Sequence, residues 1–192
     1  MIFRAVEDAD LIRRARVQSG PGAVEAFNLL VSRWEKRVYN YLLRLAGNRE
    51  DALDLTQDVF LKAYQNLRKL DDPARFAPWL YRIAHNEACS LFRKRRPEAE
   101  ATEAETEPTE SEVTVAGSSV FPIELTLAVA SALSRLSPDQ REAVVLKIYQ
   151  GFKFEEMAEI LECPVSTIKS RLYTALAILK AELAPIKARG VS

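Results

Sequence analysis

Residues 154–183 read FEEMAEILECPVSTIKSRLYTALAILKAEL, and this stretch predicts two amphipathic helices separated by a tight break. Apolar side chains recur in it at steps of three and four residues, which places them on one face of each helix. The inward-facing residues are Phe154, Met157, Ala158, Leu161, Ile168, Leu172, Ala175, Leu176 and Leu179. Pro164 ends the first helix because it lacks an N–H donor and its ring clashes with the preceding turn. Ser166 or Thr167 then caps the second helix, so the stretch is predicted to be a helix-turn-helix.

The outward side of the second helix carries residues that suit duplex DNA. A helix that enters the major groove brings its first side chains to the base edges and its positive end close to phosphate. The predicted duplex-binding residues are Ser166, Thr167, Lys169, Ser170, Arg171 and Tyr173. Arg171 is the expected base reader among them. The alternative is a plain helical hairpin whose lysine and arginine side chains are solvated.

Residues 97–122, PEAEATEAETEPTESEVTVAGSSVFP, have no helical apolar period. Residues 97–124 hold eight acidic and no basic side chains, whereas residues 1–96 hold eighteen basic and twelve acidic ones, although the net charge of the chain is zero. Like-charge repulsion and the lack of apolar area to bury predict a flexible acidic linker. It separates predicted domains at residues 1–96 and 123–192. We also consider the hypothesis that this acidic segment shields the basic domains in the free protein.

The first domain is predicted to be helical as well. Its apolar residues recur at helical steps in several stretches, and turn-forming residues at 20–22, 47–48 and 71–73 separate these stretches. No convincing alternation with period two indicates a strand. We therefore expect an all-α fold with two small helical domains, the second of which contains the helix-turn-helix.

Residues 48–67, NREDALDLTQDVFLKAYQNL, place Asp51, Asp54 and Asp58 on one side of a helix. No cation of the segment matches them on that side, so this face suits a basic partner surface, and Leu55 is expected to add an apolar anchor at its edge. The predicted partner-binding residues are Asp51, Asp54, Leu55, Gln57 and Asp58. The alternative is an ordinary solvated helix face.

Residues 75–96, RFAPWLYRIAHNEACSLFRKRR, predict a helix with aromatic residues in its first half and four cations at its end. Unpaired nucleic acid is bound by this combination, because rings stack on bases and cations follow the phosphates. The predicted single-strand-binding residues are Phe76, Trp79, Tyr81, Asn86, Arg93, Lys94, Arg95 and Arg96. The alternative, which we favour for Trp79, Ile83 and Leu91, is a place in the core.

Together these motifs resemble an extracytoplasmic-function sigma factor, the two-domain branch of the bacterial sigma family. The resemblance covers almost the whole chain. The matching segments are AFNLLVSRW (26–34), EDALDLTQDVFLKAY (50–64), FAPWLYRIAHN (76–86), RKRR (93–96) and LSPDQREAVVLKIYQGFKFEEMAEILECPVSTIKSRL (136–172). It implies an alternative sigma factor that directs core RNA polymerase to promoters and is controlled by an anti-sigma factor.

The resemblance also implies a division of roles. The first domain, sigma region 2, is expected to bind the clamp coiled coil of polymerase through the DLTQD face and to capture the melted minus-ten strand. The resemblance implies that one base of that strand enters a pocket in the loop at residues 69–78. The second domain, sigma region 4, is expected to bind the minus-thirty-five duplex and the polymerase flap, with the linker threading toward the active-site and RNA-exit channels.

Three positions depart from the pattern of the family and leave the promoter sequence open. Many relatives carry Asp where this chain has Ser90, and Arg is common where Thr174 stands. Glu162 occupies a turn position that Gly often fills in helix-turn-helix proteins.

Other classes fit the sequence less well. The single histidine, His85, has no triad partners nearby, and there is no glycine-rich phosphate loop, so we expect no enzyme, no metal and no cofactor. Cys89 and Cys163 are expected to be small buried groups. No apolar run reaches the roughly 18 residues that span a bilayer, and we expect a cytoplasmic protein without membrane insertion. A self-sufficient regulator or an anti-sigma decoy is the other rival, and the clamp-facing segment argues against it.

Overall fold

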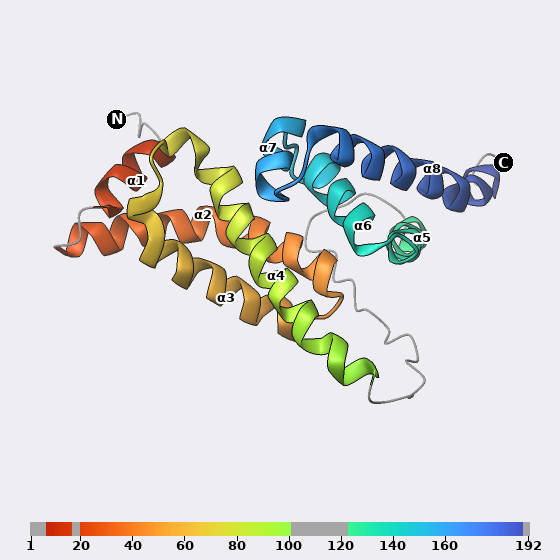
Figure 1. The fold of residues 1–192 in the computed structure, drawn as a ribbon, viewed down its shortest axis with the longest axis horizontal. Helices are drawn as coiled ribbons and strands as arrows, with labels where there is room; N and C mark the ends of the chain where they lie inside the picture. Colours follow the sequence, from red (N-terminus) through yellow and green to blue (C-terminus); the bar gives the residue numbers. More distant parts are fainter. Residues whose placement is uncertain (1–6, 17–19, 101–122, 190–192) are drawn as a thin grey trace. The chain divides into compact units, whose positions relative to one another are not determined.

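The computed structural model describes residues 7–16, 20–100 and 123–189, and every regular element in these ranges is helical. The chain forms two compact units, Met1–Glu103 and Ala104–Ser192 (Figure 1). The prediction of an all-α chain with two small helical domains is confirmed.

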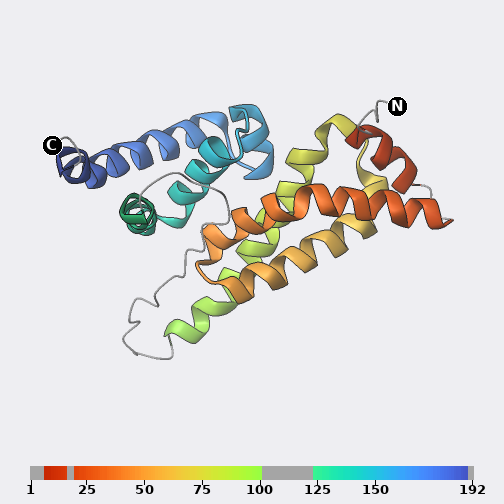
Figure 2. The same cartoon turned by 180° about the vertical axis from the view of Figure 1, so that it is seen from behind.

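The first unit is a bundle of long helices. It contains α1 (Asp8–Ala15), α2 (Pro21–Ala46), α3 (Arg49–Asn66) and α4 (Phe76–Glu100), with 3-10 turns η1 (Leu67–Lys69) and η2 (Pro73–Arg75). Helix α2 packs against α1 and α3, and α4 packs against both α2 and α3. Figures 1 and 2 show α4 lying across the α2–α3 pair. The core of the unit lies between these helices.

The turn between α2 and α3 follows from two adjacent residues. Gly47 adopts a left-handed conformation with φ 76°, and its N–H donates to the Leu43 carbonyl at 3.0 Å, which ends α2. Asn48 then caps α3, because its side chain accepts a hydrogen bond from the Asp51 N–H at 2.9 Å. The start of α3, and therefore the direction of its carboxylates, is fixed locally.

Helix α4 continues through Glu100 and does not end at Arg96, where the sequence predicted the end of the domain. Pro97 lies inside this helix at a cost, because it removes one backbone hydrogen bond and its ring crowds the preceding turn, although its fixed φ is close to the helical value. The residues after it, Glu98 to Glu100, are good helix formers. Residues 101–122 of the predicted linker lie outside the described residues.

The second unit contains a helix-turn-helix supported by two further helices. Its elements are α5 (Ile123–Ser134), α6 (Pro138–Val144), the π-helical turn η3 (Val145–Tyr149), α7 (Phe154–Ile160) and α8 (Val165–Arg189). Helices α5, α6 and α7 all pack against α8. The fully buried side chains include Leu146, Met157, Ile160 and Ile168. Leu176, predicted to face inward, is instead exposed.

Arg141 connects two helices of the second unit. Its guanidinium donates to the carbonyls of Leu133 at 3.1 Å and Ser134 at 3.2 Å, so it binds the end of α5 to α6. Burial lowers the pKa of this guanidinium.

Across the ranges that the structure describes, no helix combines the length and the apolar character that a bilayer-spanning segment needs.

Candidate protein- and nucleic-acid-binding surfaces

Helix α3 presents two exposed carboxylates, as the sequence predicts. Asp54 and Asp58 lie one turn apart on its solvent side, with Gln57 beside them. Neither aspartate makes an ion pair with any of the described side chains. Two uncompensated negative charges on one helix face are suited to a basic partner.

The apolar anchor beside these carboxylates is a different residue from the one predicted. Leu55 is only 6% exposed and packs in the core, because it lies on the stripe of α3 that faces the bundle. Leu53 and Leu61, exposed by 45% and 56%, flank the carboxylates instead. We call Leu53, Asp54, Gln57, Asp58 and Leu61 the acidic–apolar surface. Sequence reasoning missed both leucines, although their spacing from Asp54 and Asp58 places them on the same side of the helix.

Asp51 is engaged within the protein and is not available in this arrangement. Its carboxylate receives two hydrogen bonds from the Arg95 guanidinium, at 2.5 Å and 2.6 Å, and it also contacts the Asn48 amide. Arg95 comes from the far end of α4, so the pair joins α3 to α4 across the bundle. Asp51 and Arg95, predicted to bind a protein and a DNA strand, are thus partnered with each other.

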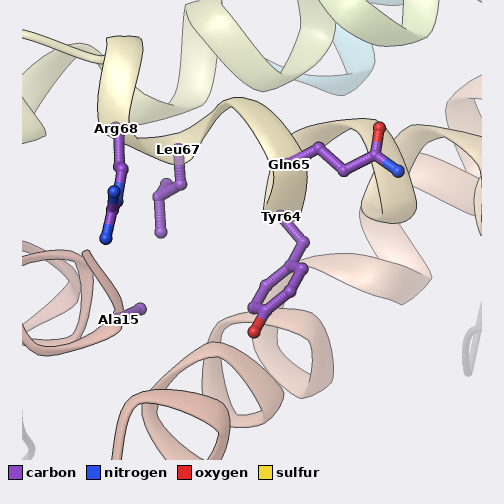
Figure 3. Close-up of a pocket in the computed structure, with 5 residues that line it drawn as sticks. All are labelled: Ala15, Tyr64, Gln65, Leu67 and Arg68. Atoms are coloured by element: carbon purple, nitrogen blue, oxygen red, sulfur yellow. The ribbon is translucent and has the colours of Figure 1, made fainter. Parts of the chain in front are cut away.

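A pocket of about 250 Å³ lies near the C-terminal end of α3 (Figure 3). Tyr64, Gln65, Leu67 and Arg68 line it together with Ala15 of α1. The Tyr64 ring packs edge-on against Phe27 at 4.9 Å and still leaves nearly half of its side chain exposed. Tyr64 lies about one turn beyond Leu61, so the pocket extends the acidic–apolar surface.

Two of the predicted strand-binding aromatic residues are in the core. Phe76 is 2% exposed and Tyr81 is fully buried, the latter with its ring 5.0 Å from that of Tyr41. Burial raises the pKa of Tyr81 well above its usual range, while Arg37 and Arg44 act in the opposite direction. The expectation that Phe76 and Tyr81 offer their faces to bases is corrected: α2 covers the side of α4 on which they lie.

The rest of α4 offers polar and cationic groups to solvent. Asn86, Arg93 and Lys94 are exposed, and Trp79 is half-buried with its ring 5.9 Å from that of Phe76. The side chain of Arg96 lies outside the described part of the chain. Of the predicted strand-binding residues, Asn86, Arg93 and Lys94 are therefore the exposed polar and cationic ones that the structure leaves without a described partner.

An aromatic–cationic pair on α2 was missed by sequence reasoning. The Arg37 guanidinium lies 4.9 Å from the Trp34 ring centroid, and the Trp34 ring contacts Phe76 at 5.7 Å. Asp8 orients Trp34 by accepting a hydrogen bond from its Nε1 at 3.0 Å. The spacing of Trp34 and Arg37, three residues apart in a helix, is the signal that could have found the pair. The Trp34 ring of this pair lies against Phe76, near the end of the predicted base-capture loop.

The turn of the helix-turn-helix contains the only non-glycine residue with positive φ in the described chain. Glu162 has φ 49°, and this left-handed residue allows the chain to reverse between α7 and α8. Helix α8 begins at Val165, and the Pro164 carbonyl accepts hydrogen bonds from the N–H groups of Thr167 and Ile168. Ser166 and Thr167 therefore lie in the first turn of α8 and do not cap it, contrary to the prediction.

The outward side of α8 consists of side chains predicted to meet duplex DNA. Ser166, Lys169, Ser170 and Tyr173 are exposed, with Tyr173 at 61%. They recur at three- and four-residue steps from the start of the helix, so one side of α8 carries them together. This side combines hydroxyl groups, one ammonium and one aromatic ring.

Arg171, the predicted base reader, is directed into its own domain. Its Nη2 lies 2.5 Å from Asp139 at the start of α6, and its Nη1 donates to the Cys163 sulfur at 3.7 Å. Burial raises the pKa of the Cys163 thiol, an effect that Arg171 opposes. Arg171 therefore connects α8 to α6 and to the turn, and it must leave Asp139 to reach a base.

Comparison with known proteins places one match in each unit. Residues 30–98 match the family described as Sigma-70 region 2, and residues 126–179 match Sigma-70, region 4. The chain is 34% identical over 179 residues to the ECF RNA polymerase sigma-E factor of Haemophilus influenzae. The matched residues cover 89% of this chain and 93% of that protein.

Two solved structures are similar to this one. One is the sigma factor RpoE in complex with the anti-sigma factor NepR from Bartonella quintana, with a TM-score of 0.71 and 28% identity over 83% of this chain and 98% of that chain. The other is CnrH in complex with the cytosolic domain of CnrY, with a TM-score of 0.66 and 28% identity over 93% of this chain and 97% of that chain.

Proposed function

Because this chain belongs to the extracytoplasmic-function sigma factors, we propose that it binds core RNA polymerase, recognises the minus-ten and minus-thirty-five promoter elements and promotes strand opening for transcription initiation. The observation that carries the proposal is that both matched regions occur in order, one in each compact unit. A sigma factor directs the polymerase, so this role assigns no catalytic step to the chain itself. It also implies a cytoplasmic location, where polymerase and promoters meet.

Core polymerase is proposed to bind the acidic–apolar surface of α3. Asp54 and Asp58 supply charge for a basic surface, here the clamp coiled coil, and Leu53 and Leu61 supply apolar area that is already exposed. Exposed charges mainly accelerate and orient association, while buried apolar anchors at an interface prolong it. The surface offers both within less than three turns of one helix.

The minus-ten strand is proposed to run along α4 and to place one base in the predicted loop at residues 69–78, of which residues 76–78 form the start of α4. Leu70 and Phe76 are both buried and hold this loop at its two ends. Between them, Asp72 accepts a hydrogen bond from the Ala74 N–H at 2.9 Å and shapes the turn. A loop that is already ordered can recover the few kcal/mol of unstacking a base, since it loses little entropy on binding.

The minus-thirty-five duplex is proposed to meet the outward side of α8. Lys169, Ser170 and Tyr173 lie near the start of this helix, where the helix dipole also favours phosphate. This assignment no longer requires Arg171 as the principal base reader. The flap of polymerase is proposed to bind elsewhere on the same unit.

Control by an anti-sigma factor is part of the proposal. The two similar solved structures are both complexes, one of them with the anti-sigma factor NepR and the other with a cytosolic domain of CnrY. The hypothesis that the acidic linker shields the free protein also stays open to test. If it is correct, replacing linker glutamates with glutamine raises DNA binding by the free chain.

Reconstituted transcription tests the proposed function. The purified chain is added to bacterial core polymerase with a library of genomic promoters, and start sites are sequenced. We expect initiation that depends on both the chain and the core enzyme. A self-sufficient DNA-binding regulator would give no core-dependent initiation, and that result would exclude the proposal.

Charge reversal tests the surface on α3. Asp54→Lys and Asp58→Lys are each expected to weaken core binding about tenfold or more, because an attraction becomes a repulsion. Glu25→Lys reverses an exposed carboxylate on α2 and serves as the matched control. Equal affinities of all three variants for core polymerase, measured at low salt, would remove α3 from the interface.

A further inference from the structure

The pocket at the C-terminal end of α3 has walls of different chemistry. Figure 3 shows the side chains of Tyr64 and Arg68 extending to the same side of the chain, with Leu67 between them. Ala15 of α1 faces them from the opposite side, and Leu67 is buried, with 2% of its surface exposed. The pocket is therefore a slot with an aromatic wall, a guanidinium wall and an apolar floor.

The size of the slot suits a small organic molecule. A cavity of about 150 Å³ holds benzene, so a space of about 250 Å³ can take one ring with a substituent. The Tyr64 ring is held edge-on by Phe27, with 4.9 Å between the centroids, while 46% of the tyrosine remains exposed. A flat ligand can thus stack on a ring that is already oriented, which limits the entropy lost on binding.

The charge around the slot is positive. None of the described lining residues is acidic, and Arg68 makes no ion pair with a described carboxylate. Arg16 directly follows Ala15, and the buried Nε and Nη2 atoms of its guanidinium make no hydrogen bond with any described group. Buried N–H groups without a partner cost free energy and mark places where a water or an ion is bound. These two cations favour an anionic ligand.

Two acids of the adjoining segments direct their carboxylates elsewhere. Asp10 of α1 is paired with Arg13, and Asp72 accepts a hydrogen bond from the Ala74 N–H at 2.9 Å. The C-terminal end of α1 carries a partial negative charge, but Arg13 and Arg14 lie in its last turn and oppose it. The positive potential at the slot therefore remains available to a ligand.

We propose that this pocket binds a small organic anion, a ring or short apolar body with one carboxylate or phosphate group, between the Tyr64 ring and the Arg68 guanidinium. A guanidinium is a planar fork that donates two parallel hydrogen bonds to either kind of oxyanion. Leu67 and Ala15 contact the apolar body, and Arg16 contributes positive charge from the end of α1. Neither polymerase binding nor promoter recognition requires such a ligand, so the site goes beyond the proposed function.

The form of the slot favours a small molecule over a nucleic-acid strand. A groove for single strands follows successive phosphates and stacks successive bases. This slot has one aromatic wall and one guanidinium among its described lining residues. A single compact ligand engages both, and competition with an oligonucleotide distinguishes the two kinds of ligand.

Titration of matched probes into the full-length chain tests the site. The probes are para-fluorobenzoate, para-fluorophenyl phosphate and the uncharged para-fluorobenzamide, and fluorine NMR follows their binding. At least one of the anions is expected to bind with a dissociation constant of about 1 mM, the strength ordinary for a ligand of about ten heavy atoms. The benzamide should bind about tenfold more weakly, because it lacks the charge that pairs with Arg68. Equal affinities for all three probes would overturn the proposal.

Substitutions locate the bound probe. Arg68→Gln is expected to weaken binding of the anion about tenfold, because a charge-assisted hydrogen-bonded pair is lost. Tyr64→Leu removes the stacking wall and should weaken it about three- to tenfold. Lys69→Gln removes an adjacent exposed cation that does not line the pocket, and this matched control should leave the affinity unchanged. Equal losses for Arg68→Gln and Lys69→Gln would show that the probe follows net charge and not the pocket.

The remaining outcomes separate this site from the other proposed surfaces. A short single-stranded oligonucleotide that displaces the probe, and that binds Arg68→Gln more weakly, would assign the pocket to nucleic acid and overturn the proposal. Absence of binding by both anions would overturn it as well, whereas core-dependent initiation would persist in either case. Circular dichroism establishes that each variant is folded, and if Tyr64→Leu is not, Arg68→Gln and the benzamide decide the question.

Discussion

Single residues of the second unit show how side-chain surroundings alter a role predicted from sequence. Arg171 lies on α8 and was predicted to read a base, yet its guanidinium binds Asp139 and Cys163 of its own domain. Its side chain is 30% exposed and that of Asp139 is 59% exposed, so water screens the ion pair. Such a pair contributes little stability, but it fixes the direction of the guanidinium.

Removing the Asp139–Arg171 pair is expected to have a small effect on stability. A double-mutant cycle with Asp139→Ala and Arg171→Ala should give a coupling free energy of about 0.5–1 kcal/mol, because the pair is partly solvated. Chemical denaturation of the single and double variants measures it. A coupling of zero would mean that the contact does not hold α8 to α6.

The left-handed residue in the turn offers a second test. Glu162 has φ 49°, a conformation that costs an L-residue about 1 kcal/mol relative to glycine. Glu162→Gly is therefore expected to raise the free energy of unfolding by about 0.5–1 kcal/mol. Glu159→Gly, inside α7, is the control and should lower it by about 1 kcal/mol. Destabilisation by both variants would show that the other contacts of Glu162 outweigh its backbone strain.

At the scale of the element, α3 has two faces with different roles. One face stabilises the fold, and the other is proposed to bind a partner. One face places Leu55, Val59 and Ala63 in the core, and the other exposes the acidic–apolar surface. The capping residue Asn48 and the Asp51–Arg95 pair fix the rotation of this helix in the bundle. The carboxylates therefore stay on the solvent side because the opposite face is committed to the core.

Two leucine substitutions on α3 are expected to give opposite results. Leu55→Ala should lower the free energy of unfolding by about 2–4 kcal/mol, because it leaves a cavity in the core. Leu61→Ala should change stability by less than about 0.5 kcal/mol and weaken binding to core polymerase. Denaturation curves and a core-binding assay measure the two effects. A stable Leu55→Ala variant, or undiminished core binding by Leu61→Ala, would contradict this division.

At the scale of the whole molecule, the chain combines two units that have separate cores. Tyr41 and Tyr81 lie in the core of the first unit, and Met157 and Ile168 lie in the core of the second. Domains with their own cores can fold alone. The proposed function needs this independence, because one unit holds an opened strand while the other binds intact duplex.

Separate production of the two units is the corresponding test. Residues 1–103 and 104–192, made as separate chains, are each expected to unfold cooperatively, and the sum of their far-ultraviolet circular dichroism spectra should match the spectrum of the full chain. The first fragment should bind core polymerase and the second should not support initiation. An unfolded fragment would show that its core depends on the other unit.

The sequence identified the fold class, the helix-turn-helix and many exposed members of the candidate surfaces. Asp54, Asp58, Asn86, Lys169 and Tyr173 are all exposed, as their helical spacing predicts. Periodicity is a local property: steps of three and four residues show which side chains share one face of a helix, whatever surrounds that helix. The order of the motifs along the chain can also be read from the sequence, and it identified the family. The matches to Sigma-70 regions 2 and 4 confirm that identification.

Only the tertiary structure decided which side chains of a face remain available. Leu55, Phe76 and Tyr81 lie against neighbouring helices, and Arg95 and Arg171 are paired with carboxylates from α3 and α6. The spacing of residues along a helix shows in which direction each side chain points from the helix axis. The elements that cover that direction come from distant parts of the chain. The contacts of Lys147 and Lys169 with the Phe154 ring also depend on tertiary structure, because three separate elements must pack together before these side chains meet.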